Sequence, residues 1–161
     1  MFFVRERIGE IIKQLEQYCY KNAVTIDGWK GKAEHFPITD NVEFDVSEWD
    51  VVKPNFLGEK SSTYFGMATE VVIPETMDGL PVELFISTGR EGEWDATNPQ
   101  IAAYVNGKLQ QGLDVNHRNL RISECAKAGD VYSVFMSVYT GERGSIYQWD
   151  SKLRAIHTEV Y

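Results

Sequence analysis

The feature that most constrains the fold of this chain is the two-residue alternation of apolar and polar side chains in its second half. The sharpest case is VYSVFMSVY, residues 131–139, in which Tyr132, Val134, Met136 and Val138 fall on one face and two serines on the other. Successive side chains of a β-strand point to opposite faces of its sheet. This segment therefore predicts a strand with one face on a core.

Further segments have the same character, and turn residues separate them. They are TYFGMATEVVIP (63–74), PVELFIS (81–87), QIAAYVNG (100–107), SIYQW (145–149) and LRAIHTEV (153–160). Seven or eight strands at such short intervals predict a mainly β fold, a jelly-roll (galactose-binding-like) β-sandwich, rather than a parallel α/β sheet. Residues 25–63 carry mostly turn signals, with a short strand expected around residues 42–46.

The first residues follow a different period. Apolar side chains recur at the spacing of one helix face, at Val4, Ile8, Ile11, Ile12, Leu15 and Cys19. We expect an N-terminal amphipathic helix within residues 1–24 and one β-sandwich domain over residues 25–161. Because a single helix cannot bury its own apolar face, this helix must pack on the rest of the chain or on a domain outside it.

Composition narrows the classes of partner. The chain has 161 residues and a net charge of −8, which disfavours nucleic acid and anionic membrane surfaces as partners. The two cysteines, Cys19 and Cys125, have no CxxC spacing and predict reduced, partly buried thiols. With no secretion signal and no apolar run of membrane-spanning length, we expect a cytoplasmic protein.

The segment AAYVNGKLQQGLDVNH, residues 102–117, concentrates turn residues. Asn106 and Gly107 stand between two strand-like runs, which is typical of a type I′ hairpin turn. Gly112 follows, and then come three polar residues, Asp114, Asn116 and His117. These three can cap backbone groups at a turn or belong to a metal or catalytic site; a zinc site needs three or four convergent ligands, and His35 and His157 stand alone. The turn interpretation is favoured, with all six residues forming a structural corner or a domain interface.

A second polar segment lies at residues 91–98. Glu91 and Glu93 form an acid pair of the kind that glycoside hydrolysis needs, although an acidic solvated loop is the favoured interpretation. Trp94, with Asp95 and Asn98, is a candidate for binding a sugar by stacking and hydrogen bonds, although packing is favoured for this tryptophan as well. No nucleophile or phosphate-loop motif is present.

The order of these motifs resembles the N-terminal β-domain of the large α-mannosidases of glycoside hydrolase family 38, of the bacterial and vacuolar/cytosolic type. The likeness runs from Thr63 to Gly141, and YVNGKLQQGLDVNHRNLRI, residues 104–122, is its most specific part. One departure is Tyr64-Phe65-Gly66, where many members have a tryptophan, often followed by a basic residue.

The resemblance implies that a catalytic (β/α) domain follows this one. That domain would hold a divalent metal, usually zinc, in a His-x-His-x-Asp type motif, which this chain lacks, and an Asp nucleophile. We therefore expect no catalytic residue and no cofactor here. The chain, ending without a cap at Tyr161, is expected to be an accessory domain that packs on the catalytic domain of the same polypeptide and contributes to oligomer contacts. The alternatives are a carbohydrate-binding module, with an oligosaccharide as partner, and a stand-alone interaction domain.

Overall fold

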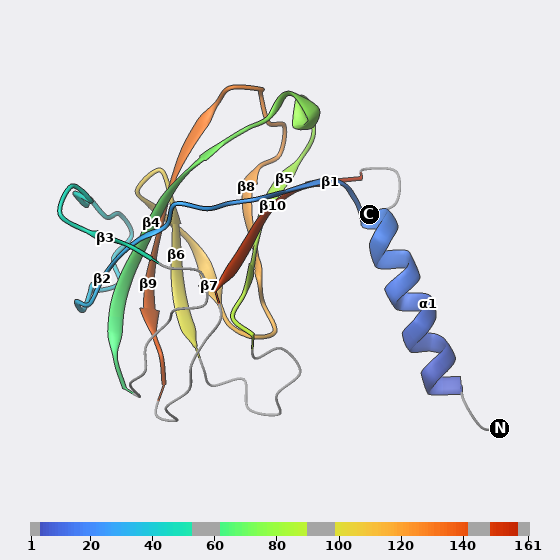
Figure 1. Ribbon diagram of the computed structural model, residues 1–161, viewed down its shortest axis with the longest axis horizontal. Helices are drawn as coiled ribbons and strands as arrows, with labels where there is room; N and C mark the ends of the chain where they lie inside the picture. The colour runs from blue at the N-terminus through green and yellow to red at the C-terminus, as the bar shows by residue number, and fades with distance from the viewer. Residues whose placement is uncertain (1–3, 53–61, 90–98, 142–148, 158–161) are drawn as a thin grey trace.

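Two antiparallel β-sheets pack face to face in the computed structural model, which describes residues 4–52, 62–89, 99–141 and 149–157 (Figure 1). The four-stranded sheet has the order β1-β10-β5-β8, and the six-stranded sheet has the order β3-β2-β4-β9-β6-β7. The elements are α1 (Val4–Cys19), β1 (Tyr20–Thr25), β2 (Lys30–Lys32), β3 (Asp50–Val51), β4 (Tyr64–Val72), η1 (Glu75–Met77), β5 (Val82–Ser87), β6 (Gln100–Val105), β7 (Lys108–Leu113), β8 (Asn119–Ser123), β9 (Val131–Tyr139) and β10 (Asp150–Ile156). The prediction of a mainly β sandwich preceded by one helix is confirmed.

The alternating segments form the central strands. Val134, Met136 and Val138 of β9 are buried in the core between the sheets, as their spacing predicts. The opposite sheet contributes inward side chains from β5, β8 and β10, among them Leu84 and Leu153, which are fully buried. The described residues contain ten strands rather than seven or eight, because β1 follows α1 directly and the short β2 and β3 extend the edge of the larger sheet.

The outer face of the six-stranded sheet is also covered. The segment of residues 36–49 crosses it and buries an aromatic cluster of five rings, Phe36, Phe44, Trp49, Tyr104 and Phe135. The expected strand at residues 42–46 is wrong, since those residues form no strand and only an isolated bridge joins Asn41 to Lys108. Their apolar side chains, Val42 and Phe44 among them, pack against the cluster instead.

Gly66 makes room for this cluster. It lies on β4, and a Cβ atom at this position would come within 2.6 Å of Phe36, 2.9 Å of Trp49 and 3.0 Å of Phe135. The glycine that departs from the family 38 pattern is therefore the residue over which the three rings close. Trp29 and Trp149 are buried as well, in the core between the sheets.

The outer face of the four-stranded sheet carries a buried ion pair. Glu83 on β5 is only 4% exposed, and Arg154 on β10 donates a 2.7 Å hydrogen bond to its carboxylate. The same guanidinium lies over the rings of Tyr20 and Phe85, at 3.8 Å and 4.1 Å from their centroids. Burial of Glu83 therefore depends on Arg154, because a buried carboxylate needs a charged or hydrogen-bonding partner.

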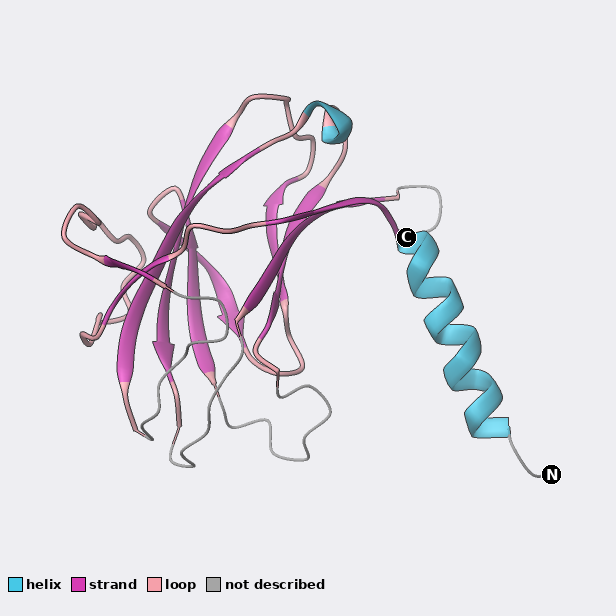
Figure 2. Ribbon diagram, in the orientation of Figure 1, coloured by secondary structure: helices cyan, strands magenta, loops and turns pink. Residues whose placement is uncertain are grey.

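The helix α1 projects away from both sheets (Figure 2). It ends at Cys19, whose backbone oxygen accepts a hydrogen bond from His157 N, and β1 begins at the next residue. Its apolar side chains stay about half exposed, from 47% at Val4 to 54% at Leu15. We expected this face to pack either on the rest of the chain or on a domain outside it. The described part of the chain does not cover it.

Both cysteines are free, as predicted. Cys19 is half-buried, but Cys125 is exposed, so the expectation of a partly buried thiol is wrong for Cys125. Among the described residues, no helix is long and apolar enough to cross a membrane.

Substitution of Gly66 tests the packing of the aromatic cluster. We expect Gly66→Ala to lower the free energy of unfolding by about 1–3 kcal/mol, because the added methyl group collides with rings that cannot rotate away. The matched control is Gly112→Ala on β7, where the added Cβ would lie 3.8 Å from Ile101 O, at ordinary contact distance. Urea denaturation of the two variants measures the difference. Equal stabilities for both variants and the unsubstituted chain would contradict the close packing described.

Candidate functional site

The corner between β7 and β8 carries the chain from one sheet to the other. Asp114 is the residue that holds it: its Oδ1 accepts hydrogen bonds from the backbone N–H of Asn116 and of His117, both at 2.7 Å. The backbone N–H of Asp114 donates to His117 O at 3.0 Å, and Val115 is buried beneath the turn. The carboxylate therefore serves as the internal acceptor of a tight turn.

The charge of Asp114 is favoured by the same contacts. Partial burial by itself raises the pKa of this carboxyl, but the hydrogen bonds from the backbone of His117 and Asn116, and from the His117 imidazole, act more strongly in the other direction. The pKa of Asp114 is therefore lowered from its ordinary value. His117 Nδ1 lies 3.1 Å from Asp114 Oδ1, and its side chain is 76% exposed.

The hairpin between β6 and β7 adopts the predicted turn. Asn106 and Gly107 have φ values of 50° and 75°, and Val105 pairs with Lys108 across the two-residue loop, as a type I′ turn requires. The Asn106 side chain accepts a 3.0 Å hydrogen bond from Ser133 N on β9, which fixes the hairpin to its neighbouring strand. The hairpin prediction is confirmed, and this turn has a structural role.

A groove of about 950 Å³ lies on the outer face of the six-stranded sheet, next to the aromatic cluster. We call it the outer groove and define it by His35, Tyr64, Gln100, Gln110, Asp114 and Tyr139, all of which line it.

Three small residues explain why the outer groove is open. Ser137, Ala102 and Gly112 are neighbours in register on β9, β6 and β7, and all three line the groove. Ser137 Oγ donates a 2.9 Å hydrogen bond to Phe36 O, which ties the 36–49 segment to one side of the groove. The sheet therefore presents little side-chain volume along this row, between larger side chains on either side.

An aromatic pair stands at the end of the groove. Tyr64 of β4 and Tyr139 of β9 are register partners whose rings stack at 4.7 Å between centroids and 28° between planes. His35 packs edge-on against Tyr64 at 4.5 Å. Tyr64 is 43% exposed, so much of this pair faces solvent. On the next strand, Gln100 of β6 is the register partner of Tyr139.

The structure brings only part of the predicted site together. Gly112 and Asp114 line the outer groove, Asn106 and Gly107 form the hairpin, and Asn116 and His117 complete the corner. The sugar-binding candidates Trp94, Asp95 and Asn98, and the acid pair Glu91 and Glu93, lie outside the described residues. A role of the corner at a domain interface stays a prediction.

Metal ligands do not gather in the described part of the chain. No group of three or more His, Cys, Asp or Glu residues there could hold a metal ion. The His117 imidazole contacts the Asp114 carboxylate, and the His35 ring packs against the Tyr64 ring.

Tyr64 and Tyr139 were not predicted as site residues. They lie 75 positions apart in sequence, and only the pairing of β4 with β9 makes them neighbours. The one available signal was an aromatic residue at the outward-facing end of each of two strands.

Comparison with known proteins gives a structural likeness and no sequence match. No model of a protein family matches the chain, and no curated protein matches its sequence. Among solved structures, the chain is similar to a glycosyl hydrolase family 2 member from Bacteroides cellulosilyticus, with a TM-score of 0.54 and 13% sequence identity. The likeness covers 84% of this chain and 21% of that chain, so the present chain spans about a fifth of that protein's length. At this identity the likeness concerns the fold.

Asp114 can be tested by substitution and by pH. We expect Asp114→Ala to lower the free energy of unfolding by about 1–2 kcal/mol, because two backbone N–H groups lose their acceptor. Asp114→Asn keeps an acceptor oxygen but removes the charge, so a smaller loss is expected.

The pH dependence follows from the lowered pKa. A carboxyl whose pKa is lower in the folded state stabilises the fold above its ordinary value of 3.8, and this contribution is lost as the pH falls through the lower folded value. The stability difference between the unsubstituted chain and Asp114→Asn should therefore be constant near neutral pH and shrink in acid. A difference that grows in acid would contradict the assignment.

Proposed function

We propose that this chain is a non-catalytic β-sandwich domain of a larger glycoside hydrolase. The observation that carries the proposal is the proportion of the structural match: 84% of this chain corresponds to 21% of a glycosyl hydrolase family 2 chain. A sandwich of this kind thus occurs as one part of a sugar-hydrolysing protein.

The exposed apolar face of α1 is a second observation in favour of a larger protein. A 16-residue helix is of marginal stability on its own in water, and helices in proteins are stabilised mainly by packing of their apolar face. Here Ile8, Ile11 and Leu15 are at least half exposed. We propose that this face packs on the catalytic domain of the same polypeptide.

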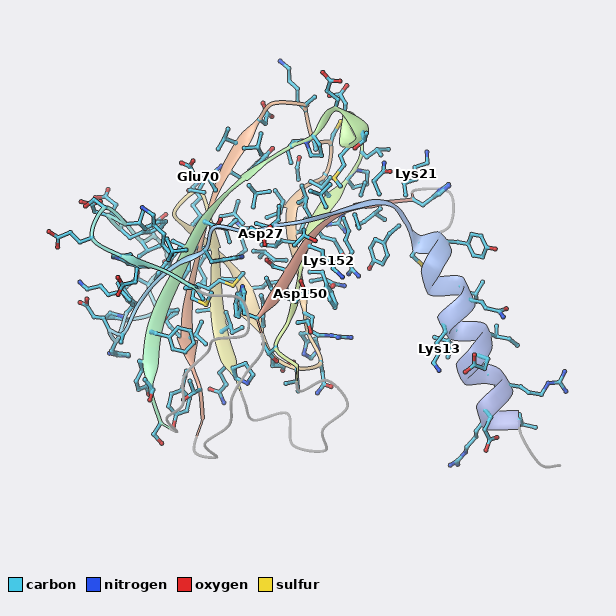
Figure 3. The ribbon with its side chains drawn as sticks, viewed as in Figure 1. Lys13, Lys21, Asp27, Glu70, Asp150 and Lys152 are labelled. Atoms are coloured by element: carbon cyan, nitrogen blue, oxygen red, sulfur yellow. The ribbon has the colours of Figure 1, made fainter. Side chains whose placement is uncertain are left out.

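The space beside α1 fits the same arrangement. A hollow of about 390 Å³ lies between Lys13 on α1 and the outer face of the four-stranded sheet, where Phe85, Arg118 and Arg154 line it. Lys13 lies on the side of α1 toward the sheets (Figure 3). A neighbouring domain seated here would contact both the helix and the sheet.

The finer assignment is to α-mannosidases of glycoside hydrolase family 38, which hydrolyse α-linked mannose. Its support is the motif series from Thr63 to Gly141, above all GLDVNH, residues 112–117. In this proposal the zinc ion and the nucleophile belong to the catalytic domain and not to this chain. We further propose a cytoplasmic location, consistent with two free thiols.

A glycosidase assay of the polypeptide encoded by the complete gene tests both the accessory role and the α-mannosidase assignment. We expect it to hydrolyse an aryl α-D-mannoside and to lose that activity on treatment with a chelator, because the catalytic domain carries the metal. The present chain alone should show no hydrolysis. Activity on a different glycoside would overturn the mannosidase assignment and keep the accessory role, whereas a gene that ends at Tyr161, or a product without glycosidase activity, would overturn both.

A further inference from the structure

We propose that the outer groove is a binding site for a neutral oligosaccharide, with a hexopyranose ring lying against the Tyr64–Tyr139 pair. The inference goes beyond the accessory role, and it rests on the groove rather than on the activity of any larger protein. It places the sugar on the outer face of the six-stranded sheet.

The size of the groove fits a small polar ligand. Its volume of about 950 Å³ is at the upper end of the ~300–1,000 Å³ typical of small-molecule sites. Gly112 is exposed on β7 and has no side chain, so a ligand can approach the sheet backbone closely there.

The aromatic pair supplies the apolar contact. One face of a pyranose ring carries mainly C–H groups, which pack on aromatic rings, and tyrosine combines an apolar body with a polar hydroxyl. Tyr64 keeps 43% of its surface exposed although it is stacked on Tyr139 and held by His35. These rings are therefore already ordered before a ligand arrives, which lowers the entropic cost of binding.

Polar groups in the groove match hydroxyl groups. Gln100 and Gln110 are exposed amides, each with donors and an acceptor. Asp114 adds a carboxylate whose Oδ1 already accepts from two backbone N–H groups of its own turn, which leaves Oδ2 as the oxygen that can face a ligand. Gln111 also lines the groove, but its Nε2 already donates to Asn119 O at 2.7 Å. A sugar hydroxyl donates and accepts at once, so amides and a carboxylate around an aromatic pair suit it better than they suit an apolar peptide.

The charge of the described lining residues favours an uncharged ligand over an anionic one. No lysine or arginine is among the described residues that line the outer groove, and Asp114 contributes a negative charge. The chain as a whole carries a net charge of −8. The negative charge of Asp114 and the net charge of the chain both disfavour a sulfated or uronic-acid polymer, so we take a neutral oligosaccharide as the ligand.

Titration of this chain with neutral oligosaccharides tests the site. The panel comprises α-linked mannobiose and mannotriose, cellotriose, β-linked galactobiose and the anionic heparin disaccharide, each followed by isothermal calorimetry and by NMR of the tyrosine ring signals. We expect at least one neutral oligosaccharide to bind and to shift the ring signals of Tyr64 and Tyr139, while the heparin disaccharide leaves them unchanged.

Variants separate the groove from other surfaces. Tyr64→Ala and Gln100→Ala should each weaken binding by about tenfold or more. The second variant removes an exposed side chain and keeps the aromatic pair, so it tests the groove even if Tyr64→Ala destabilises the fold. The matched control is Tyr18→Ala, which removes a tyrosine on α1 that is 64% exposed and should leave affinity unchanged.

Three results would overturn the proposal. They are the absence of binding across the neutral panel, binding that both groove variants leave intact, and preferential binding of the heparin disaccharide. None of them bears on the glycosidase assay of the complete gene product, so a failure of this site and a failure of the accessory role can be told apart.

Discussion

The antiparallel pairing of β4 with β9 is the interaction on which the rest of this structure depends. Nine residue pairs in register, from Tyr64 with Tyr139 to Val72 with Val131, put apolar side chains on both faces of the six-stranded sheet. One face, with Met67 and Met136, forms the core with the smaller sheet, and the other, with Phe135, carries the aromatic cluster. A slip of one residue would exchange the two faces.

The same register generates the outer groove. It aligns Gly66 with Ser137, and β6 continues the row with Ala102, so that small residues lie between the Tyr64–Tyr139 pair and the aromatic cluster. Phe36 closes the row over Gly66, and the remaining part stays open toward β7. A buried aromatic cluster and an open groove thus occur on one sheet face because of where the small residues fall.

Local patterns in the sequence were sufficient for much of this fold. The alternation in residues 131–139 and the Asn106-Gly107 turn depend on neighbours in sequence, and the structure has both as predicted. The strand expected at residues 42–46 is wrong because the apolar side chains of this segment cover a sheet face without being part of a sheet. The burial of Glu83 and the Tyr64–Tyr139 pair depend on strand partners far away in sequence, which no local pattern reveals.

Both faces of the larger sheet bury their apolar side chains within the sandwich, whereas the apolar side chains of α1 stay exposed. This contrast supports the proposal that the chain is part of a larger protein. The helix directly continues into β1, the edge strand of the smaller sheet, so a partner on α1 would also lie beside that sheet.

Hydrogen–deuterium exchange of the α1 backbone amides tests this assignment most directly, when measured in this chain and in the complete gene product. We expect the amides of residues 8–19, which can bond within the helix, to exchange rapidly in this chain, while those of β4 and β9 are protected, and to become protected in the complete product. Helix amides that are as protected as the core strands in this chain alone, or that stay unprotected in the complete product, would contradict the account.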